Sequence, residues 1–419
     1  METKRGPISA RRWVTLAFLT TALTFSYIDR YLIAVLIQPI KADLGMSDGQ
    51  IGILTGFAFA AFYALLGMPI ARWADQGFRR TVVIGSILVW SLMTAGTGLA
   101  NNFWQLAIAR FGVGAGEAGI FPTSQAILAD IFPERSRASA LALFATGGSI
   151  GLFLAFSLGT LFETWWGWRW TFVAAAAPAP LLAAIAPFFL PRQQRELPHE
   201  KVNLFLAIGK LWRNPHFRHL PFAQGALVML IFGQAQWVPA YFERSFHVSR
   251  LALGTTLGVV QSIAAVTGII SGGFLADRLA RGSGPIKLAM FGIGAAMAPM
   301  MVLYTTTRLP LGYSMVALSV FLLSLPTGPI ASHLQGVIAP AERGLTAAAA
   351  LTIASFIGLG AGPAVIGGLS DIFERYKHVE SLRYALLVST PLAACWALFH
   401  LFKISRIIDR EHSLGSINL

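Results

Sequence analysis

Long apolar runs separated by short polar segments fill almost the whole chain. Most runs hold about 20 residues or a little more, which is the length that an α-helix needs to cross a membrane. Lipid offers no hydrogen-bond partner to open backbone groups, so these runs must be helical. The pattern predicts membrane-spanning helices at residues 13–38, 50–72, 81–99, 104–129, 138–161, 169–190, 219–242, 251–276, 286–306, 310–337, 345–370 and 383–402, which makes twelve.

The longest polar connection divides these spans into two sets of six. It reads PRQQRELPHEKVNLFLAIGKLWRNPHFRHL, and its part from Val202 to Trp212 mixes apolar and basic residues as an interfacial helix would. We therefore expect an all-α membrane protein. It should have an N-terminal six-helix bundle over residues 1–190, a cytoplasmic linker over 191–218, and a C-terminal six-helix bundle with a short tail over 219–419.

A weak internal repeat relates the two sets of spans. Pro122 and Pro133 in the first half correspond to Pro329 and Pro340 in the second half, and both pairs are 207 positions apart. Six-span repeats related by an axis along the membrane normal are the plan of one large class of transporters. Their substrate binds between the halves near the midplane. The repeat therefore predicts two pseudo-symmetric halves with a binding site between them.

Composition and charge fit a membrane protein. The chain is 55% hydrophobic and 12% charged, whereas soluble domains carry roughly 25% charged residues. A net charge of +13 could suit a nucleic-acid partner, but 22 of the 32 Lys and Arg residues lie in segments on the side of the N-terminus and 8 on the other side. This bias is a topology signal that places both termini in the cytoplasm of a multi-pass inner (plasma) membrane protein. We expect no nucleic-acid partner.

One glycine motif points to an enzyme at first sight. Gly114-Ala-Gly116-Glu-Ala-Gly119 matches the dinucleotide-binding fingerprint, but that fingerprint follows a strand and opens a helix. Here it lies inside a predicted span, so we interpret the glycines as thinning the helix for a close neighbour or substrate. The chain also lacks an ATP-binding G-x-x-x-x-G-K-[ST] motif, has Cys395 as its one cysteine and scatters its histidines. We expect no enzyme activity, no metal and no organic cofactor.

Four charged residues lie deep inside predicted spans, away from their ends: Asp29, Arg30, Arg110 and Glu117. Each costs at least ~2.5 kcal/mol on insertion scales, so such residues tend to face a cavity and to pair. Arg110 and Glu117 are seven residues apart, which is two helical turns, and so they share one face. Asp29 and Arg110 lie at similar depths, so an ion pair between them is geometrically possible.

The internal repeat bears on whether these charges are structural. A shift of 207 positions maps them onto neutral residues, Gln236, Trp237, Ala317 and Ser324. Because the second copy of the scaffold lacks the charges, a functional role is favoured, with at least one of the two carboxylates as a proton carrier. The proton affinity of a carboxylate depends on burial and on a nearby arginine, and both change when a cavity opens. The alternative is a permanent structural ion pair between spans one and four.

Arg30 and Arg110 are also the candidates to bind an anionic head group, because a guanidinium offers paired donors to phosphate or carboxylate. Competition between such a ligand and a carboxylate for one guanidinium would couple substrate to protons. Polar and aromatic side chains of spans one, two and seven lie near the proposed cavity. The expected substrate contacts among them are Tyr27, Tyr31, Tyr63, Gln236, Trp237 and Tyr241.

Two polar loops and two spans carry a family resemblance. The loops read Gly273-Phe-Leu-Ala-Asp277-Arg278-Leu-Ala-Arg281 and, more loosely, Ala71-Arg-Trp-Ala-Asp75-Gln-Gly77-Phe-Arg79-Arg80. They resemble the signature loop of the major facilitator superfamily. Within it the chain resembles the Spinster branch and its bacterial members, through Tyr27-Ile-Asp29-Arg30-Tyr31, Arg110-Phe-Gly-Val-Gly-Ala-Gly-Glu117-Ala and Asp130-Ile-Phe-Pro133 followed by Arg137.

The resemblance implies a twelve-helix fold, a monomer and a cytoplasmic gate. In the superfamily, charged residues of the signature loop join the two halves when the inner side is closed. Asp75 can accept hydrogen bonds from Arg137 or lie near the N-terminus of span eleven, where the helix dipole favours a carboxylate. The alternative is a plain topology signal of basic residues. The expected gate residues are Asp75, Arg79, Arg80, Arg137, Asp277 and Arg278.

The resemblance also implies a substrate class. Animal Spinster proteins are associated with export of lysophospholipids and sphingoid phosphates, so we expect a small amphiphilic, lipid-like anion, drawn from among membrane lipids, with the proton as coupling ion. The leading hypothesis is a secondary transporter that works by alternating access. An organic anion or drug exporter, an ion-independent uniporter or scramblase, and a ligand-binding membrane receptor are the alternatives.

Overall fold

The structure is a computed structural model that describes residues 10–191, 212–279, 282–336, 343–376 and 380–415. Every regular element in these ranges is helical, which confirms the predicted all-α class. Of the predicted interfacial helix between Val202 and Trp212, only Trp212 falls within the described residues.

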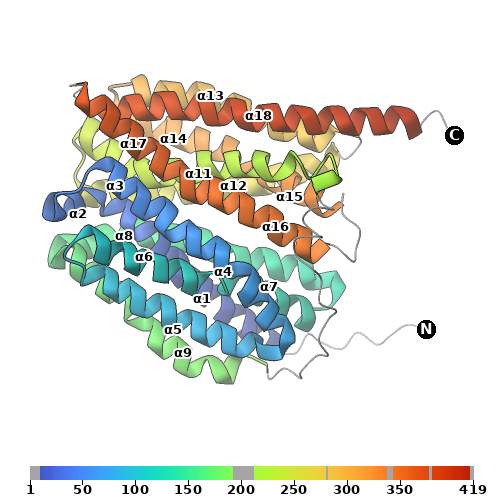
Figure 1. The fold of residues 1–419 in the computed structure, drawn as a ribbon, viewed down its shortest axis with the longest axis horizontal. Helices are drawn as coiled ribbons and strands as arrows, with labels where there is room; N and C mark the ends of the chain where they lie inside the picture. The colour runs from blue at the N-terminus through green and yellow to red at the C-terminus, as the bar shows by residue number, and fades with distance from the viewer. Residues whose placement is uncertain (1–9, 192–211, 280–281, 337–342, 377–379, 416–419) are drawn as a thin grey trace.

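The first half of the chain forms most of the lower part of Figure 1. Two of its segments are π-helical turns, labelled η, in which hydrogen bonds run from residue i to i+5. In chain order the elements are α1 (Ala10–Val35), α2 (Ile37–Leu44), α3 (Asp48–Ile53), η1 (Leu54–Ala58), α4 (Phe59–Trp73), η2 (Ala74–Phe78), α5 (Arg79–Gly98), α6 (Phe103–Glu117), α7 (Ile120–Ile131), α8 (Glu134–Ala176) and α9 (Pro178–Phe189).

The second half of the chain forms the upper part of the same view. It carries one described π-helical segment, η4, in the eleventh predicted span. In chain order its described elements are α11 (Leu220–Phe246), α12 (Arg250–Arg278), α13 (Gly284–Thr305), α14 (Leu309–Ser324), α15 (Thr327–Gly336), α16 (Arg343–Ser355), η4 (Phe356–Ala361), α17 (Gly362–Arg375) and α18 (Ser381–Gly415).

The predicted spans can be followed through these helices. Within the described ranges, eight continuous helical segments are long and apolar enough to cross a membrane, and α1 with α2 makes a ninth that bends by 59°. Two of the eight, residues 48–98 and 139–189, are hairpins that reverse at Gly77 (φ 91°) and Gly167 (φ 75°), where a positive φ suits glycine. Each hairpin supplies two spans and α6 with α7 supplies another, so these ranges contain all twelve.

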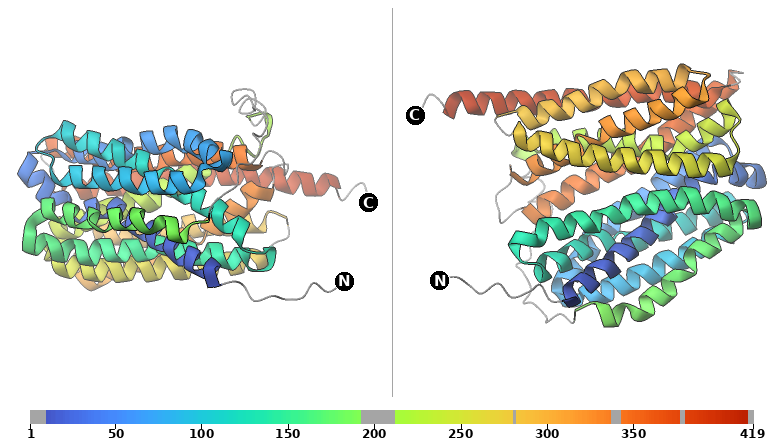
Figure 2. Two further views of the ribbon diagram at one scale, coloured as in Figure 1. Left: turned by 90° about the horizontal axis from the view of Figure 1, so that it is seen from below. Right: turned by 180° about the vertical axis from the view of Figure 1, so that it is seen from behind.

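The two ends of the molecule are distinguished by the elements that lie there. The start of α1 and the end of α18 lie at one end of the molecule, at the right of Figure 1, and we call this end the terminal side. The short helices α2 and α3 lie at the other end, which we call the far side. The views from below and from behind in Figure 2 show the same arrangement.

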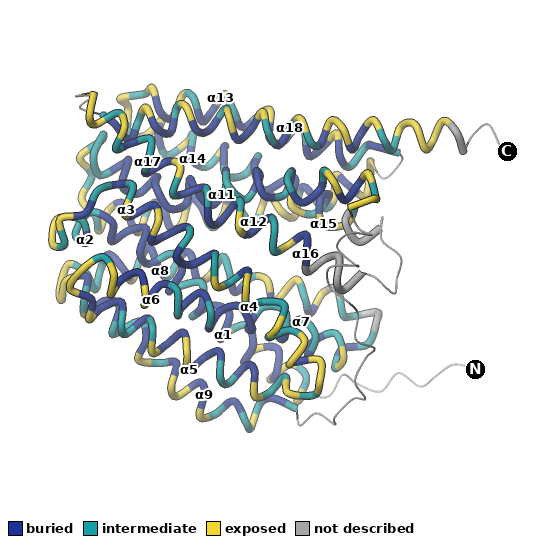
Figure 3. Tube along the Cα trace, viewed as in Figure 1, coloured by how far each residue is buried: buried dark blue, intermediate teal, exposed yellow. Residues whose placement is uncertain are grey.

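The two halves share a continuous apolar core. It contains Leu32 and Ile33 from α1, Phe156 from α8, Trp237 from α11 and Leu257 from α12, all at most 1% exposed. The halves meet where α1 contacts α11, α3 contacts α17 and α8 contacts α12. Buried positions accordingly continue from the lower into the upper helices in Figure 3.

The π-helical turns η1 and η4 face each other across the boundary between the halves. A Cβ atom on Gly56 would collide with the carbonyl oxygen of Gly360. One turn earlier, a Cβ atom on Gly52 would lie 2.5 Å from the carbonyl oxygen of Pro363. Small residues therefore let the backbones of the second and eleventh spans touch at this place.

Candidate functional site

The first of two buried ion pairs joins α1 to α6. Nε of Arg30 donates to Oε2 of Glu117 at 3.0 Å, and Nη2 of Arg30 contacts the same oxygen. Arg30 is 8% exposed and Glu117 1% exposed. The sequence predicted that both charges face a common cavity, and the structure pairs them directly.

Three aromatic rings surround the guanidinium of Arg30. Its Cζ lies 4.6 Å from the ring centre of Tyr27, 4.9 Å from that of Phe59 and 5.3 Å from that of Tyr63. A guanidinium is attracted by the face of an aromatic ring, more strongly where water is excluded. Arg30 is therefore held by one carboxylate and three rings.

The second ion pair is the one that span depth had suggested. Nη1 of Arg110 in α6 donates to Oδ2 of Asp29 in α1 at 3.3 Å. The hydroxyl of Thr94 in α5 donates to the other oxygen of Asp29 at 2.8 Å. Cζ of Arg110 also lies 6.0 Å from the ring centre of Phe59. We call Asp29, Arg30, Arg110 and Glu117 the four-charge cluster.

Hydrogen-bonding capacity in and beside this cluster is left unused. Nε of Arg110, Oε1 of Glu117 and Oε1 of Gln236 are buried without a hydrogen-bond partner. A buried polar atom without a partner costs about 1–3 kcal/mol, so functional sites are where such atoms are tolerated. Gln236 belongs to α11, and its Nε2 donates to the carbonyl oxygen of Arg30 at 3.3 Å. The second half of the chain thus reaches the cluster through Gln236.

The glycines of the apparent dinucleotide motif explain how α6 fits so closely. A Cβ atom on Gly114 would collide with the carbonyl oxygen of Phe59. A Cβ atom on Gly116 would lie 2.5 Å from the backbone nitrogen of Trp90. These glycines thin the helix for neighbouring spans, and that close packing brings Arg110 and Glu117 to α1 and α4.

The aromatic candidates divide into two groups. Tyr27 and Tyr63 contact Arg30, and Tyr31 packs beside Phe232 of the other half with ring centres 5.6 Å apart. Trp237 and Tyr241 are fully buried in the second half instead. Their polar atoms donate to the carbonyl oxygens of Pro363 and Leu303, both at 3.0 Å. The structure therefore does not bring Trp237 or Tyr241 to the four-charge cluster.

The candidate gate residues lie on the terminal side. Asp75 is exposed, with Oδ1 3.9 Å from Nη2 of Arg79. Arg79 is also ion-paired with Asp130, another residue of the first half. Arg80 is half-buried, and Nε of Arg137 is buried without a hydrogen-bond partner.

In the second half, Asp277 and Arg278 are exposed, and Cζ of Arg278 lies 5.2 Å from the ring centre of Phe274. The ion pairs described for Arg79 thus stay within one half, and Asp277 and Arg278 lie at the surface.

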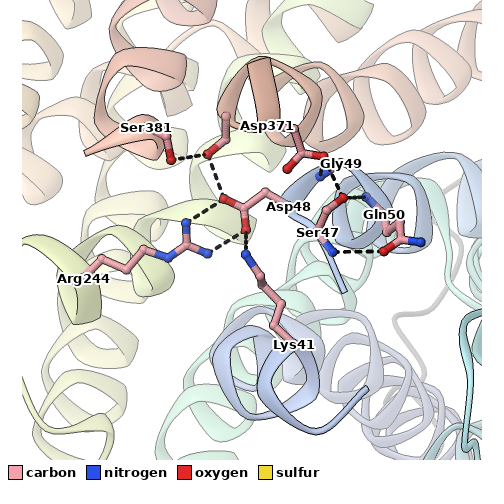
Figure 4. Close-up of polar contacts among 9 residues, drawn as sticks. Lys41, Ser47, Asp48, Gly49, Gln50, Arg244, Asp371 and Ser381 are labelled. Atoms are coloured by element: carbon pink, nitrogen blue, oxygen red, sulfur yellow. Dashed lines mark hydrogen bonds and ion pairs between the residues drawn. The ribbon is translucent and has the colours of Figure 1, made fainter. Parts of the chain in front are cut away.

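On the far side, a polar cluster that the sequence reading missed crosses between the halves (Figure 4). The carboxylate of Asp48, at the start of α3, is fully buried and accepts hydrogen bonds from Arg244 of α11 at 2.6 and 2.7 Å. Ser370 of α17 donates to it at 2.7 Å, and Lys41 is a further ion-pair partner. Asp48 therefore ties the first half to two helices of the second.

A second carboxylate makes the reverse connection. Asp371 of α17 accepts from the hydroxyl of Ser47 at 2.6 Å and from the backbone N–H of Gly49 at 2.9 Å, at the N-terminus of α3 (Figure 4). Ser47 also caps α3 with Gln50. This capping pattern, Ser followed three residues later by Gln, was the sequence signal available here. We call Lys41, Ser47, Asp48, Arg244, Ser370 and Asp371 the far-side cluster.

The described residues contain no group of three or more His, Cys, Asp or Glu that could hold a metal ion. The four-charge cluster offers guanidinium and carboxylate groups in a buried, aromatic-walled setting. Such groups can bind an anion and exchange a proton. They do not resemble the ligand set of a cation site.

Comparison with known proteins agrees with this geometry. Residues 19–363 match the Major Facilitator Superfamily. An MFS-type efflux pump of Mycolicibacterium smegmatis is 30% identical over 92% of this chain and 90% of its own length. A cis,cis-muconate transport protein of Acinetobacter baylyi is 28% identical over 88% of this chain and 90% of its own length.

Spinster relatives are also similar over most of the chain. Human protein spinster homolog 1 is 25% identical over 93% of this chain and 80% of its own length. The crystal structure of a bacterial homologue of the human lysosomal transporter Spinster, in an inward-facing and unoccupied conformation, superposes with a TM-score of 0.84 at 26% identity. That likeness covers 96% of this chain and 98% of the other. The predicted resemblance to Spinster proteins is confirmed.

Proposed function

This chain belongs to the Major Facilitator Superfamily and is a Spinster-like membrane transporter, and from that premise we propose that it couples proton movement to the transport of an amphiphilic organic anion. The observation that carries the proposal is the four-charge cluster. It places two carboxylates and two guanidiniums together in the buried interior of the first half.

The two arginines are not equivalent, and the difference assigns them separate roles. Arg30 is engaged by Glu117 and by three aromatic rings. Arg110 makes one 3.3 Å contact to Asp29 and keeps a buried Nε without a partner. A guanidinium with free donors is suited to phosphate or carboxylate. Arg110 is therefore the residue that binds the anionic head group in this proposal.

Competition for Arg110 supplies the coupling. An anion that binds Arg110 takes the place of Asp29, and a buried carboxylate without its cationic partner takes up a proton. Anion and proton are then bound together, and both are released when Asp29 pairs with Arg110 again. Glu117, with Oε1 unpartnered beside Arg30, is the second carboxylate that can hold a proton.

The test uses purified protein in liposomes with an imposed pH gradient. The probes are a fluorescent lysophosphatidylglycerol and radiolabelled cis,cis-muconate. We expect gradient-driven uptake in the wild type and its loss in Asp29→Asn combined with Glu117→Gln. Uptake that stays gradient-driven in the double variant would show that neither carboxylate carries the proton. Movement without a pH response would favour a uniporter or scramblase, and binding without movement a receptor.

A second candidate function is the transport of small organic anions or drug-like molecules. It is favoured by the efflux pump and the cis,cis-muconate transport protein, which are 30% and 28% identical to this chain. The two probes separate the candidates, because only the lysophospholipid carries a long acyl chain. In either case Arg110→Ala should weaken the binding of anionic probes more than the binding of neutral ones. If both were weakened equally, Arg110 would not be the residue that binds the head group.

We also propose the orientation in the membrane. The bias of Lys and Arg toward the terminal side supports a cytoplasmic location for that side. The far-side cluster then closes the outer end of the protein. Reporter fusions at residue 415 and in the loop after Leu44 would locate the two sides, and an external signal from residue 415 would contradict the assignment.

A further inference from the structure

We infer that Phe59 is a positioning residue of this transporter. Its ring contacts the guanidinium of both ion pairs in the four-charge cluster. The inference rests on the proposed function and deepens it. Phe59 is 1% exposed, and its ring centre lies 4.9 Å from Cζ of Arg30 and 6.0 Å from Cζ of Arg110. Among the described cation–π contacts, Phe59 alone meets both arginines.

The fold fixes this ring from two directions. The π-helical turn η1 ends at Ala58, directly before Phe59, and π-helical turns inside α-helices are frequent at functional sites. On the other side, Gly114 of α6 leaves room for the backbone carbonyl of Phe59. Tyr63, one turn later, stacks on the ring with centres 5.5 Å apart. Backbone and side chain are both held, so the ring has a defined position.

Phe59 also lies where the two halves meet. It packs in a small buried cluster with Val113 of its own half and with Phe232 and Leu359 of the other half. Leu359 belongs to η4, the π-helical turn that faces η1. A change in the contact between the halves therefore reaches the ring directly, and through the ring it reaches both guanidiniums.

The chemistry of the ring explains what it positions. An aromatic face attracts a guanidinium without neutralising its charge, so it can hold Arg30 beside Glu117 and keep Arg110 in place while Arg110 exchanges Asp29 for the substrate anion. Without its π face, the guanidinium of Arg110, now 3.3 Å from Asp29, would approach that carboxylate more closely. Exchange between carboxylate and substrate would then need a more acidic medium.

The test compares Phe59→Leu with Phe59→Tyr, which restores the aromatic face. The matched control is Phe62→Leu, because Phe62 lies on the same helix and its ring contacts Phe111 and neither arginine. The first readout needs no substrate: the thermal unfolding midpoint of purified protein is measured as a function of pH. We expect Phe59→Leu to change the pH at which stability falls, and Phe59→Tyr to restore the wild-type profile.

The control should lower the midpoint by the same amount at every pH. If Phe59→Leu also gave only a uniform offset, the ring would be ordinary packing and the inference would be wrong. The second readout is uptake of the two probes into liposomes, where Phe59→Leu should shift the pH profile to lower pH and weaken apparent affinity about fivefold. A wild type without a pH response would contradict the proposed function alone, while the unfolding profiles still decide the role of Phe59.

Discussion

At the scale of single residues, the two ion pairs of the four-charge cluster have different roles, one in stability and one in binding. Arg30 and Glu117 form a buried pair with short contacts, whereas Arg110 and Asp29 are joined by one longer bond. Removing one member of a buried pair leaves the other as an uncompensated charge, which costs far more than removing both. This asymmetry indicates that the Arg30–Glu117 pair stabilises the fold, whereas the Arg110–Asp29 pair takes part in binding.

A double-mutant cycle should make this visible. We expect Arg30→Met to lower the free energy of unfolding by roughly 3–5 kcal/mol, because Glu117 stays buried without a cation. Arg30→Met combined with Glu117→Gln should recover most of that loss. The measurement is equilibrium unfolding by sodium dodecyl sulfate in mixed micelles. Additive losses in the double variant would show that the two side chains do not stabilise one another.

Some of this site could be predicted from single residues, and some could not. The Asp29–Arg110 pair follows from the depths of two charges in antiparallel spans, and it forms. Trp237 follows Gln236, and in a helix neighbouring residues point about 100° apart, so Gln236 reaches Arg30 and Trp237 donates to the carbonyl oxygen of Pro363. Asp48 lies just before the predicted start of the second span. A charged residue is ordinary in a loop between spans, so nothing in the sequence singled it out.

At the scale of helices, close packing depends on glycine at particular positions. The fourth predicted span was expected as one run from 104 to 129, but it divides into α6 and α7 around Gly119. A Cβ atom on Gly119 would lie 2.5 Å from the hydroxyl of Ser86 in α5. Apolar periodicity predicts that a helix exists, but it does not show where the helix divides, nor close contacts such as this one with another span.

Alanine substitutions test the packing role of these glycines. Gly114→Ala should destabilise the protein by about 1–3 kcal/mol, because its Cβ meets the backbone of Phe59 and overpacking is costly. Gly67→Ala in α4 is the matched control. Its Cβ would meet nothing within 4 Å, so the change should be neutral or slightly stabilising. Thermal unfolding in detergent compares the two, and equal effects would contradict the packing account.

At the scale of the whole molecule, the far-side cluster holds one end of the two halves together. Asp48 and Asp371 each accept hydrogen bonds from the opposite half. A third contact, between Glu163 of α8 and Arg250 of α12, crosses the same boundary. Alternating access requires these contacts to break whenever the far side opens.

Breaking the cluster should therefore favour opening at the far side. Asp48→Asn removes the charge that Arg244 and Lys41 neutralise. We expect it to raise the labelling rate of a cysteine placed by Ile51→Cys, in a Cys395→Ser background, by roughly 30-fold or more, since losing one member of a buried charge pair costs about 2–5 kcal/mol and 1.4 kcal/mol is tenfold.

The control for this experiment is Asp43→Asn. Asp43 pairs with Arg169, also on the far side, but both residues belong to the first half of the chain. Its loss should leave the labelling rate unchanged. A rise in both variants would mean that the effect comes from surface charge and not from contact between the halves.

The π-helical turn η1 has a mechanical consequence for the cluster beside it. It accommodates one residue more than a regular α-helix would over the same length, so the second span contains one extra residue at this turn. If η1 tightened into α-helix, the start of α4 would rotate by about 100°. Phe59 and Tyr63 would then leave the guanidinium of Arg30 together, and a local change in winding would uncover a buried positive charge.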